Sequence, residues 1–307
     1  MLTLIALIVA GLVGLTIGGE LLVRGAVAIA HRLGISNLVT GVVIMGAATS
    51  MPEMVASVQA ALSGSPGVAW GNVVGSNLAN TLLILGATAV IAPIVMHGVG
   101  KRDAVVALIA TLALWALTVT QLAGAWIGAL LLALLVIYIL WRVNHPRDID
   151  EEEESDGKEP TLPLAIVLFV GGLAVLIGGG QLLVTGAINL AGQLGVSDAV
   201  IGLTVVAVGT SLPELAASVA AALRGRSDLA VGNVVGSNIY NILLIGGATM
   251  TIAPLPIPTE MLDLELPVLA VSALLLLGLC HFAKRIGRAL GLMLLAAFFA
   301  NTVLLFV

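Results

Sequence analysis

The sequence is a series of long apolar runs separated by short polar breaks. Most runs reach the roughly 20 apolar residues that a helix needs to span a bilayer, and none alternates every second residue as the strands of a membrane barrel do. The composition agrees, because hydrophobic residues make up 60% of the chain and charged residues only 9%. The sequence therefore predicts an all-α polytopic membrane protein and excludes an ordinary soluble or nucleic-acid-binding domain.

Ten membrane-spanning helices are expected from these runs. Their ranges are 2–30, 36–62, 68–92, 104–121, 124–142, 162–191, 197–223, 229–252, 264–282 and 288–306. Because no basic region precedes the first run, we expect it to remain as a helix rather than to be removed as a signal peptide. The acidic segment 144–161 is too polar to bury a core, so it is predicted to be a linker between units 1–143 and 162–307.

The basic residues predict how the helices are oriented. Of the 12 lysines and arginines, Arg24 lies inside the first span, and the others lie in connections that follow odd-numbered spans. The positive-inside rule places such connections in the cytoplasm. Both termini are therefore expected outside the cell, with the acidic linker inside.

The two halves of the chain repeat each other at one constant offset, which carries Glu53 onto Glu214. GAATSMPEMVASVQAAL at 46–62 matches AVGTSLPELAASVAAAL at 207–223, and GNVVGSNLANTLLILGAT at 71–88 matches GNVVGSNIYNILLIGGAT at 232–249. Because each half holds an odd number of spans, the second copy must cross the membrane in the opposite orientation. Inverted repeats are typical of secondary transporters, whose substrate site lies near the bilayer midplane on interrupted helices.

Three acidic residues lie in the interior of the predicted spans, away from the span ends, and two of them are without a local basic partner. An ionisable group in hydrocarbon costs at least about 2.5–3.5 kcal/mol, so each needs a partner or a function. Glu20 is expected to pair with Arg24, four residues later on the same helical face. Glu53 and Glu214 have no basic residue nearby in the sequence, so we expect them to bind a cation from outside the protein.

Each of these two glutamates follows a proline in the sequence Thr-Ser-x-Pro-Glu. Pro52 and Pro213 have no N–H and clash with the preceding turn, so each should interrupt its helix and free main-chain carbonyls. Ser50 and Ser211 add hydroxyl oxygens at the same places. The freed carbonyls are expected near Ala48, Thr49, Gly209 and Thr210.

The following span of each half carries polar residues at every fourth position, which places them on one helical face. These residues are Asn72, Ser76 and Asn80 in the first half, and Asn233, Ser237 and Asn241 in the second. Every expected ligand is an oxygen atom, which favours a hard cation over zinc or copper. Calcium takes 6–8 oxygens in a flexible geometry, and several sodium ions could share the same oxygens.

The doubled Thr-Ser-x-Pro-Glu motif, each copy followed by Gly-Asn-Val-Val-Gly-Ser-Asn-x-x-Asn, resembles the paired repeats of the cation/calcium exchanger superfamily. The resemblance covers essentially the whole chain and is closest to the prokaryotic sodium/calcium exchangers. It implies that Glu53, Glu214 and the carbonyls of Thr49 and Thr210 bind calcium. For sodium it implies Gly46, Ser50, Glu53, Ser76, Asn80, Ala207, Ser211, Glu214, Ser237 and Asn241. The first and sixth spans would be long helices that slide across the site on their glycines.

The expected function is thus antiport of sodium against calcium by alternating access, in a prokaryotic cell membrane. A calcium/proton antiporter of the same superfamily stays open, because two close buried carboxylates could also hold protons. A channel is a further alternative. An enzyme is not expected, since no G-x-S-x-G or H-E-x-x-H pattern is present. We expect no cofactor beyond the transported ions, no partner other than lipid, and a functional monomer.

Overall fold

We describe a computed structural model of the chain, which places residues 2–34, 36–62, 64–96, 99–145, 160–193, 209, 211–254 and 256–304. Within these ranges the chain is helical apart from two short strands, so the predicted all-helical class is confirmed. The strands β1 (Ile94–Val95) and β2 (Arg285–Ile286) pair antiparallel. Most of the acidic linker and the first part of the predicted seventh span lie outside the described residues.

The first half begins with one long helix and continues through two interrupted ones. Its helices are α1 (Leu2–Leu33), α2 (Asn37–Val39), the π-helix η1 (Thr40–Met45), α3 (Gly46–Thr49), α4 (Met51–Leu62), α5 (Pro66–Leu78), the π-helix η2 (Ala79–Ile84), α6 (Leu85–Ile91), α7 (Lys101–Thr120) and α8 (Ala125–Asn144).

The second half follows the same order where it is described. Its helices are α9 (Leu162–Gln193), α12 (Leu212–Leu223), α13 (Ser227–Tyr240), the π-helix η4 (Asn241–Gly246), α14 (Gly247–Ile252), the 3-10 helix η5 (Thr259–Leu262), α15 (Glu265–Phe282) and α16 (Arg288–Leu304). The offset of the sequence repeat carries α4 onto α12 at both ends.

Seven described helices are long and apolar enough to cross a membrane, and the bent pair Thr40–Thr49 and Met51–Leu62 brings the number to eight. Two shorter apolar helices, Leu212–Leu223 and Arg288–Leu304, lie at the places of the predicted seventh and tenth spans. Many large apolar side chains are exposed, among them Val119, Val167 and Phe299. Such a surface suits lipid rather than water.

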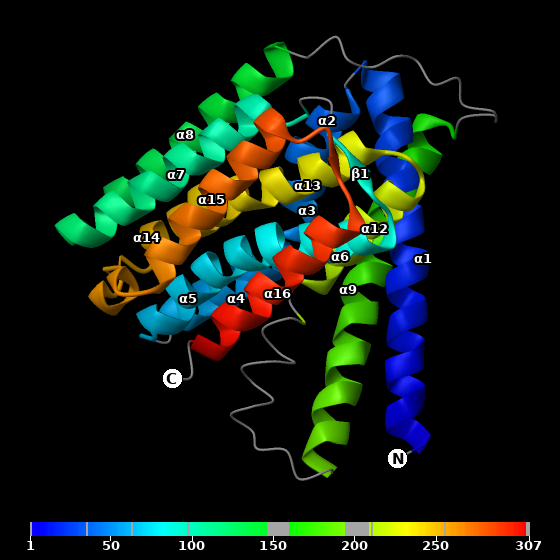
Figure 1. Cartoon of the computed structure of the whole chain (residues 1–307), viewed down its shortest axis with the longest axis horizontal. Helices are drawn as coiled ribbons and strands as arrows, with labels where there is room; N and C mark the ends of the chain where they lie inside the picture. The colour runs from blue at the N-terminus through cyan, green and yellow to red at the C-terminus, as the bar shows by residue number, and fades with distance from the viewer. Residues whose placement is uncertain are drawn as a thin grey trace.

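The helices α1 and α9 run side by side in opposite directions along one side of the bundle (Figure 1). Glycines let their backbones touch, since a Cβ atom added at Gly18 would lie 2.6 Å from the nitrogen of Leu176. A Cβ at Gly25 would lie 2.4 Å from the nitrogen of Phe169. The contact advances along α1 as it recedes along α9, which makes this pair antiparallel. Small residues at such seams allow close helix packing in membranes.

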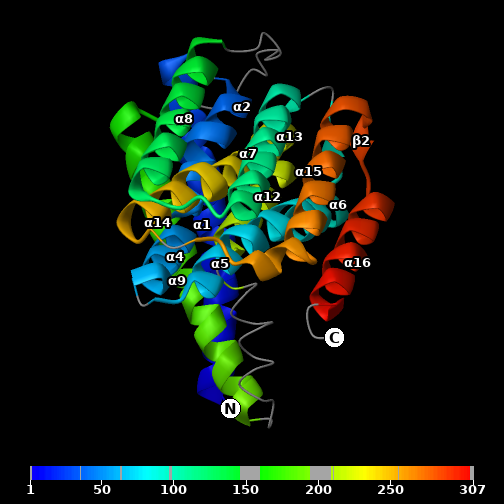
Figure 2. The same cartoon turned by 90° about the vertical axis from the view of Figure 1, so that its left-hand side faces the viewer.

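The core of the bundle is built around α13. Of the most apolar 18-residue stretch in the span Ser227–Ile252, 94% is buried in the protein. The corresponding figure is 22% for α1 and for α9. Helices α7, α8 and α15 cover the side of the core opposite to α1 and α9 (Figures 1 and 2). The most buried helices are therefore those that carry the asparagines and serines at every fourth position, which we call the polar stripes.

The polar connections of the two halves meet. The β1–β2 ladder joins the connection after the predicted third span to that after the ninth. The N–H of Val95 donates to Ser227 Oγ at 3.1 Å, which adds the connection after the seventh span. These three connections therefore lie together at one end of the bundle.

The expected pairing of Glu20 with Arg24 is wrong. Arg224, which caps the C-terminal end of α12, forms a bidentate ion pair with Glu20. Sequence spacing indicates partners along one helix, but α1 packs against α12 because Gly19 brings it within contact of the Ala216 carbonyl. The pair is partly exposed, with side-chain exposures of 38% and 44%.

Asp103 is a further buried acid, which the predicted spans did not include. Helix α7 begins at Lys101, earlier than expected, and brings Asp103 inside with an exposure of 1%. Asp103 accepts hydrogen bonds from Arg142 Nε at 2.9 Å and from the Tyr138 hydroxyl at 2.8 Å. Its charge is thus satisfied within the scaffold formed by α7 and α8.

Candidate ion-binding site

The second predicted span is interrupted at Ser50, as its proline suggested. The helical segments Thr40–Thr49 and Met51–Leu62 meet at 46°, and Ser50 between them has φ −81° and ψ 4°. Pro52 accounts for the interruption because it has no N–H to bond back to the preceding turn. Ser211 has nearly the same backbone angles, φ −89° and ψ 7°, directly before α12 and Pro213.

Each interruption presents a buried glutamate. Glu53 lies in the first turn of α4 and Glu214 in the first turn of α12, with exposures of 1% and 3%. The carboxylate of Glu214 lies within electrostatic reach of Glu53 and beside the hydroxyl side chains of Thr49 and Ser50. The two acids that the repeat relates therefore approach each other from the two halves of the chain.

The predicted asparagine ligands lie where the neighbouring helices widen. Asn80 is the second residue of the π-helix η2, and Asn241 is the first residue of the π-helix η4. Both are buried. Short π-helical segments inside α-helices are frequent at functional sites. The serines one turn earlier, Ser76 and Ser237, are buried on the same helices.

Polar atoms without hydrogen-bond partners concentrate at this place. In the described part of the chain, 11 buried side-chain nitrogen or oxygen atoms are unpaired, and six belong to the predicted site. They are Ser50 Oγ, Glu53 Oε2, Asn80 Nδ2, Glu214 Oε2, Ser237 Oγ and Asn241 Oδ1. A buried unpaired polar atom costs about 1–3 kcal/mol, so this cluster indicates a ligand that the protein itself does not supply.

The charge at the site is not balanced from within the described residues. The buried basic side chain among them is Arg142, and it is paired with Asp103. Nor does any group of three or more His, Cys, Asp or Glu side chains form in those ranges. The arrangement is thus two carboxylates surrounded by neutral oxygen donors, which suits a hard cation.

Two asparagines of the predicted stripes have a different role from the others. Asn72 Nδ2 donates to the main-chain carbonyl of Glu53 at 3.0 Å and to Ser57 Oγ at 2.8 Å. Asn233 makes the equivalent bonds one repeat later. Sequence reasoning placed both residues on the ligand face without distinguishing them. The shared spacing alone could not show that their amides bond to the protein.

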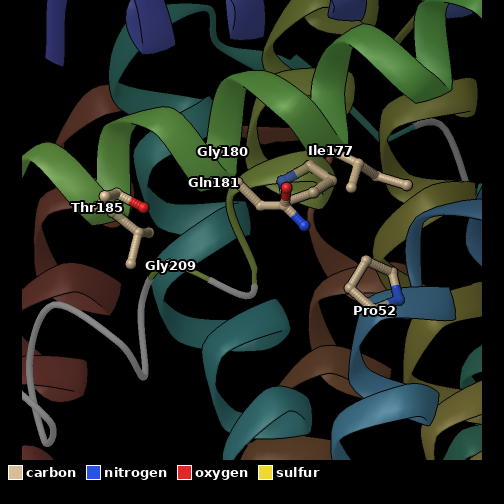
Figure 3. A pocket seen from close by; sticks show the side chains of 8 residues that line it. Pro52, Ile177, Gly180, Gln181, Thr185 and Gly209 are labelled. Carbon is tan, nitrogen blue, oxygen red and sulfur yellow. The ribbon is translucent and has the colours of Figure 1, made fainter. Parts of the chain in front are cut away.

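A cavity of about 240 Å³ lies beside the two interruptions. Pro52 and Pro213 line it, and α9 contributes the polar side chains of Gln181 and Thr185. Figure 3 shows Gln181 extending from α9 into the space above Pro52. The lining thus includes the residue before each glutamate, but neither glutamate itself.

The structure describes most, but not all, of the predicted ligands. Gly46 is buried at the start of α3, and Thr49 is buried at its end, with its hydroxyl 3.0 Å from the Met45 carbonyl. Ser211 is buried at the second interruption. Ala207 and Thr210 lie outside the described residues.

Comparison with known proteins supports the resemblance. The chain is 39% identical to the proposed antiporter CaxA of Alkalimonas amylolytica, over 100% of this chain and 99% of that protein. It is 31% identical to the sodium/calcium exchanger MaX1 of Methanosarcina acetivorans, over 96% of each. A structure of the sodium-calcium exchanger NCX_Mj superposes with a TM-score of 0.85 at 33% identity, over 99% of each chain.

A family match covers both halves of the chain. The family described as sodium/calcium exchanger protein matches residues 3–144 and again residues 164–307. The starts of the two matches, at positions 3 and 164, are related by the same offset as Glu53 and Glu214. Its relatives are exchangers, which are ion transporters rather than enzymes. This membrane protein, a cation/calcium antiporter, belongs to the sodium/calcium exchanger family.

Proposed function

We propose that this protein exchanges sodium for calcium by alternating access, with both ions bound between Glu53 and Glu214. The observation that carries the proposal is the meeting of two buried glutamates, without a basic partner among the described residues, in a cluster of unpaired polar atoms. Desolvated acids of this kind need a cation to remain charged.

The charges and donors favour calcium and sodium. Two carboxylates balance one divalent ion, and calcium accepts the mixed set of carboxylate, carbonyl and hydroxyl oxygens that the site offers. The Thr49 hydroxyl is already directed to the Met45 carbonyl, so Thr49 would serve through its carbonyl, with Thr210 as its counterpart. The hydroxyl and amide groups of Ser50, Ser76, Asn80, Ser211, Ser237 and Asn241, with the carbonyls of Gly46 and Ala207, would bind sodium.

Alternating access would use the two halves as inverted repeats. We assign five spans to residues 1–143 and five to 162–307, joined by the acidic linker 144–161. The antiparallel α1–α9 pair packs backbone to backbone, so it can move across the core as one body. The cavity beside Pro52 and Pro213 gives ions a route to the glutamates from one side.

The basic connections assign the orientation. The connections that meet at β1 and β2 would face the cytoplasm of a prokaryotic cell, leaving both termini outside. One chain contains both glutamates and both stripes, so a monomer suffices for exchange. The solved relative NCX_Mj is described in terms of extracellular ion exchange, which is the behaviour expected of such a site.

The glutamates themselves provide the first test. Glu53→Gln keeps the shape of the side chain and removes one of the two charges, so sodium-driven calcium uptake into proteoliposomes should fall by at least about 100-fold. Glu260→Gln is the matched control, because Glu260 is an exposed acid far along the chain in η5. Undiminished uptake by Glu53→Gln would refute the assignment.

Proton coupling is the second candidate, favoured by the proximity of Glu214 to Glu53. Two adjacent buried carboxylates repel each other and can share a proton instead of a metal ion. The unpaired hydroxyl of Ser237 and amide of Asn241 favour sodium, since proton transfer does not need them. Calcium uptake driven by an imposed sodium gradient, compared with an imposed pH gradient of equal size, separates the two.

A further inference from the structure

Two asparagines, one in each half, donate hydrogen bonds to the main chain of the two glutamates. Asn72 Nδ2 is 3.0 Å from the main-chain oxygen of Glu53 and 2.8 Å from Ser57 Oγ. In the other half, Asn233 Nδ2 is 3.3 Å from the main-chain oxygen of Glu214 and 3.0 Å from Ser218 Oγ. Every member of the second set is the repeat counterpart of a member of the first.

The amide nitrogens of Asn72 and Asn233 are fully engaged with the protein. Each Nδ2 carries two hydrogens, and the two observed acceptors use both. Asn233 Oδ1 also contacts Thr49 Oγ1 at 3.4 Å, although the hydrogen of that hydroxyl is directed to the Met45 carbonyl at 3.0 Å. By contrast, Asn241 Oδ1 and the Glu53 and Glu214 Oε2 atoms are buried and unpaired. The stripe thus separates into residues that bond to the protein and residues left for the ion.

The bonds join the helices that carry the two kinds of ligand. Glu53 and Ser57 lie one turn apart on α4, and Asn72 comes from α5, which also carries Ser76. An amide that holds two points one turn apart fixes both the rotation and the height of α4 against α5. Calcium–oxygen distances lie within about 2.3–2.6 Å, so a slip of a few tenths of an ångström at this contact weakens coordination.

We propose that Asn72 and Asn233 are positioning residues for ion binding: each holds the main chain of its glutamate in register with the next helix. Asn233 also contacts Thr49 of the other half. It therefore links the glutamate of one repeat to a predicted calcium ligand of the other. The inference rests on the proposed function, since it concerns the same ions and the same site.

The test compares calcium affinity with stability in matched variants. Asn72→Leu and Asn233→Leu keep the approximate size of the side chain and remove both donors. Partners that hold metal ligands in place change metal affinity by about 10- to 100-fold when they are replaced. We expect the Kd for ⁴⁵Ca²⁺ on the purified protein to rise by that factor, more for Asn233→Leu than for Asn72→Leu.

Asn77→Leu is the control, because Asn77 is buried on α5, more fully than Asn72, but its Nδ2 bonds to the Val73 carbonyl of its own helix. It should lower the ion-free melting temperature as much as Asn72→Leu does, and leave the Kd within about 2-fold. Ser57→Ala removes one of the two acceptors and should raise the Kd by less, whereas Ser57→Thr keeps the hydroxyl and should restore it.

The outcomes separate the two proposals. If the wild-type protein shows no saturable ⁴⁵Ca²⁺ binding, the proposed function fails whatever the variants do. If wild type binds calcium and the two leucine variants keep its Kd, or lose affinity only in step with Asn77→Leu, the positioning role is overturned while the proposed function stands.

Discussion

The glycine contact between α1 and α9 makes a prediction in which neighbouring substitutions have opposite signs. A Cβ atom added at Gly172 would lie 2.4 Å from the nitrogen of Leu22 and 2.9 Å from the oxygen of Gly18. Ordinary contacts begin at 3.4 Å, so the two helices would have to separate by about 1 Å. Both obstacles are backbone atoms, which cannot turn away as a side chain could. Overpacking of this kind costs about 1–3 kcal/mol.

Gly171 is the matched control, since it precedes Gly172 on the same helix and a Cβ there meets nothing within 4 Å. Replacing an interior helical glycine by alanine without a clash stabilises by about 0.5–1 kcal/mol, because alanine loses less backbone entropy. Gly171→Ala should therefore raise the melting temperature, and Gly172→Ala should lower it. The free energies of unfolding of the two variants should differ by about 1.5–4 kcal/mol.

The assay is thermal unfolding of the purified variants in one detergent at one scan rate, because unfolding of membrane proteins is often irreversible. Gly179 and Gly178 allow an independent repetition: a Cβ at Gly179 would lie 2.8 Å from the Leu15 nitrogen, and one at Gly178 meets nothing. If Gly172→Ala proved as stable as Gly171→Ala, the backbone contact between α1 and α9 would be refuted.

The two ion pairs outside the site predict effects of different size. Both side chains of the Glu20–Arg224 pair are more than one-third exposed. A double-mutant cycle with Glu20→Gln and Arg224→Gln should therefore give a coupling energy of only about 0.2–1 kcal/mol in thermal unfolding, and less in about 1 M salt. A coupling energy that salt leaves unchanged would contradict this. Asp103→Ala leaves the buried Arg142 without its ion-pair partner and should destabilise by about 3–5 kcal/mol. Tyr138→Phe removes one hydrogen bond to the charged Asp103 and should cost about 1.5–3 kcal/mol in the same denaturation experiment. Equal losses in Asp103→Ala and Tyr138→Phe would show that Arg142 finds another partner.

The parts of the fold that local chemistry determines were predictable from the sequence. Apolar runs of bilayer length predicted the helices, and Pro52 predicted the interruption of the second span, because a missing N–H acts on its own turn. The offset of the repeat then required the two interruptions to look alike. The backbone angles of Ser50 and Ser211 are nearly equal in both φ and ψ, which is the agreement that a repeated local cause should produce.

The parts that depend on packing were not predictable in this way. Glu20 pairs with a residue 204 positions away, and i,i+4 spacing indicates partners only along one helix. Likewise, the burial of Asp103 depends on Tyr138 and Arg142 of the following helix. The π-helical turns at Asn80 and Asn241 have no evident local signal in the sequence. Their register follows from how the surrounding helices pack.

The contrast among the four buried or partly buried acids gives the strongest reason for placing the ion between two of them. Asp103 and Glu20 each have an arginine partner, although neither partner is near in the sequence. A fold that can bring basic side chains to its acids across such distances has brought none to Glu53 and Glu214 among the residues described here. It has placed these two acids together instead, where their repulsion costs energy unless a cation lies between them. This cost arises at two positions that the repeat relates, and the lack of a countercharge among the described residues is what the proposed ion site would require. An internal arginine would neutralise the carboxylates permanently, and a carrier needs a countercharge that can leave.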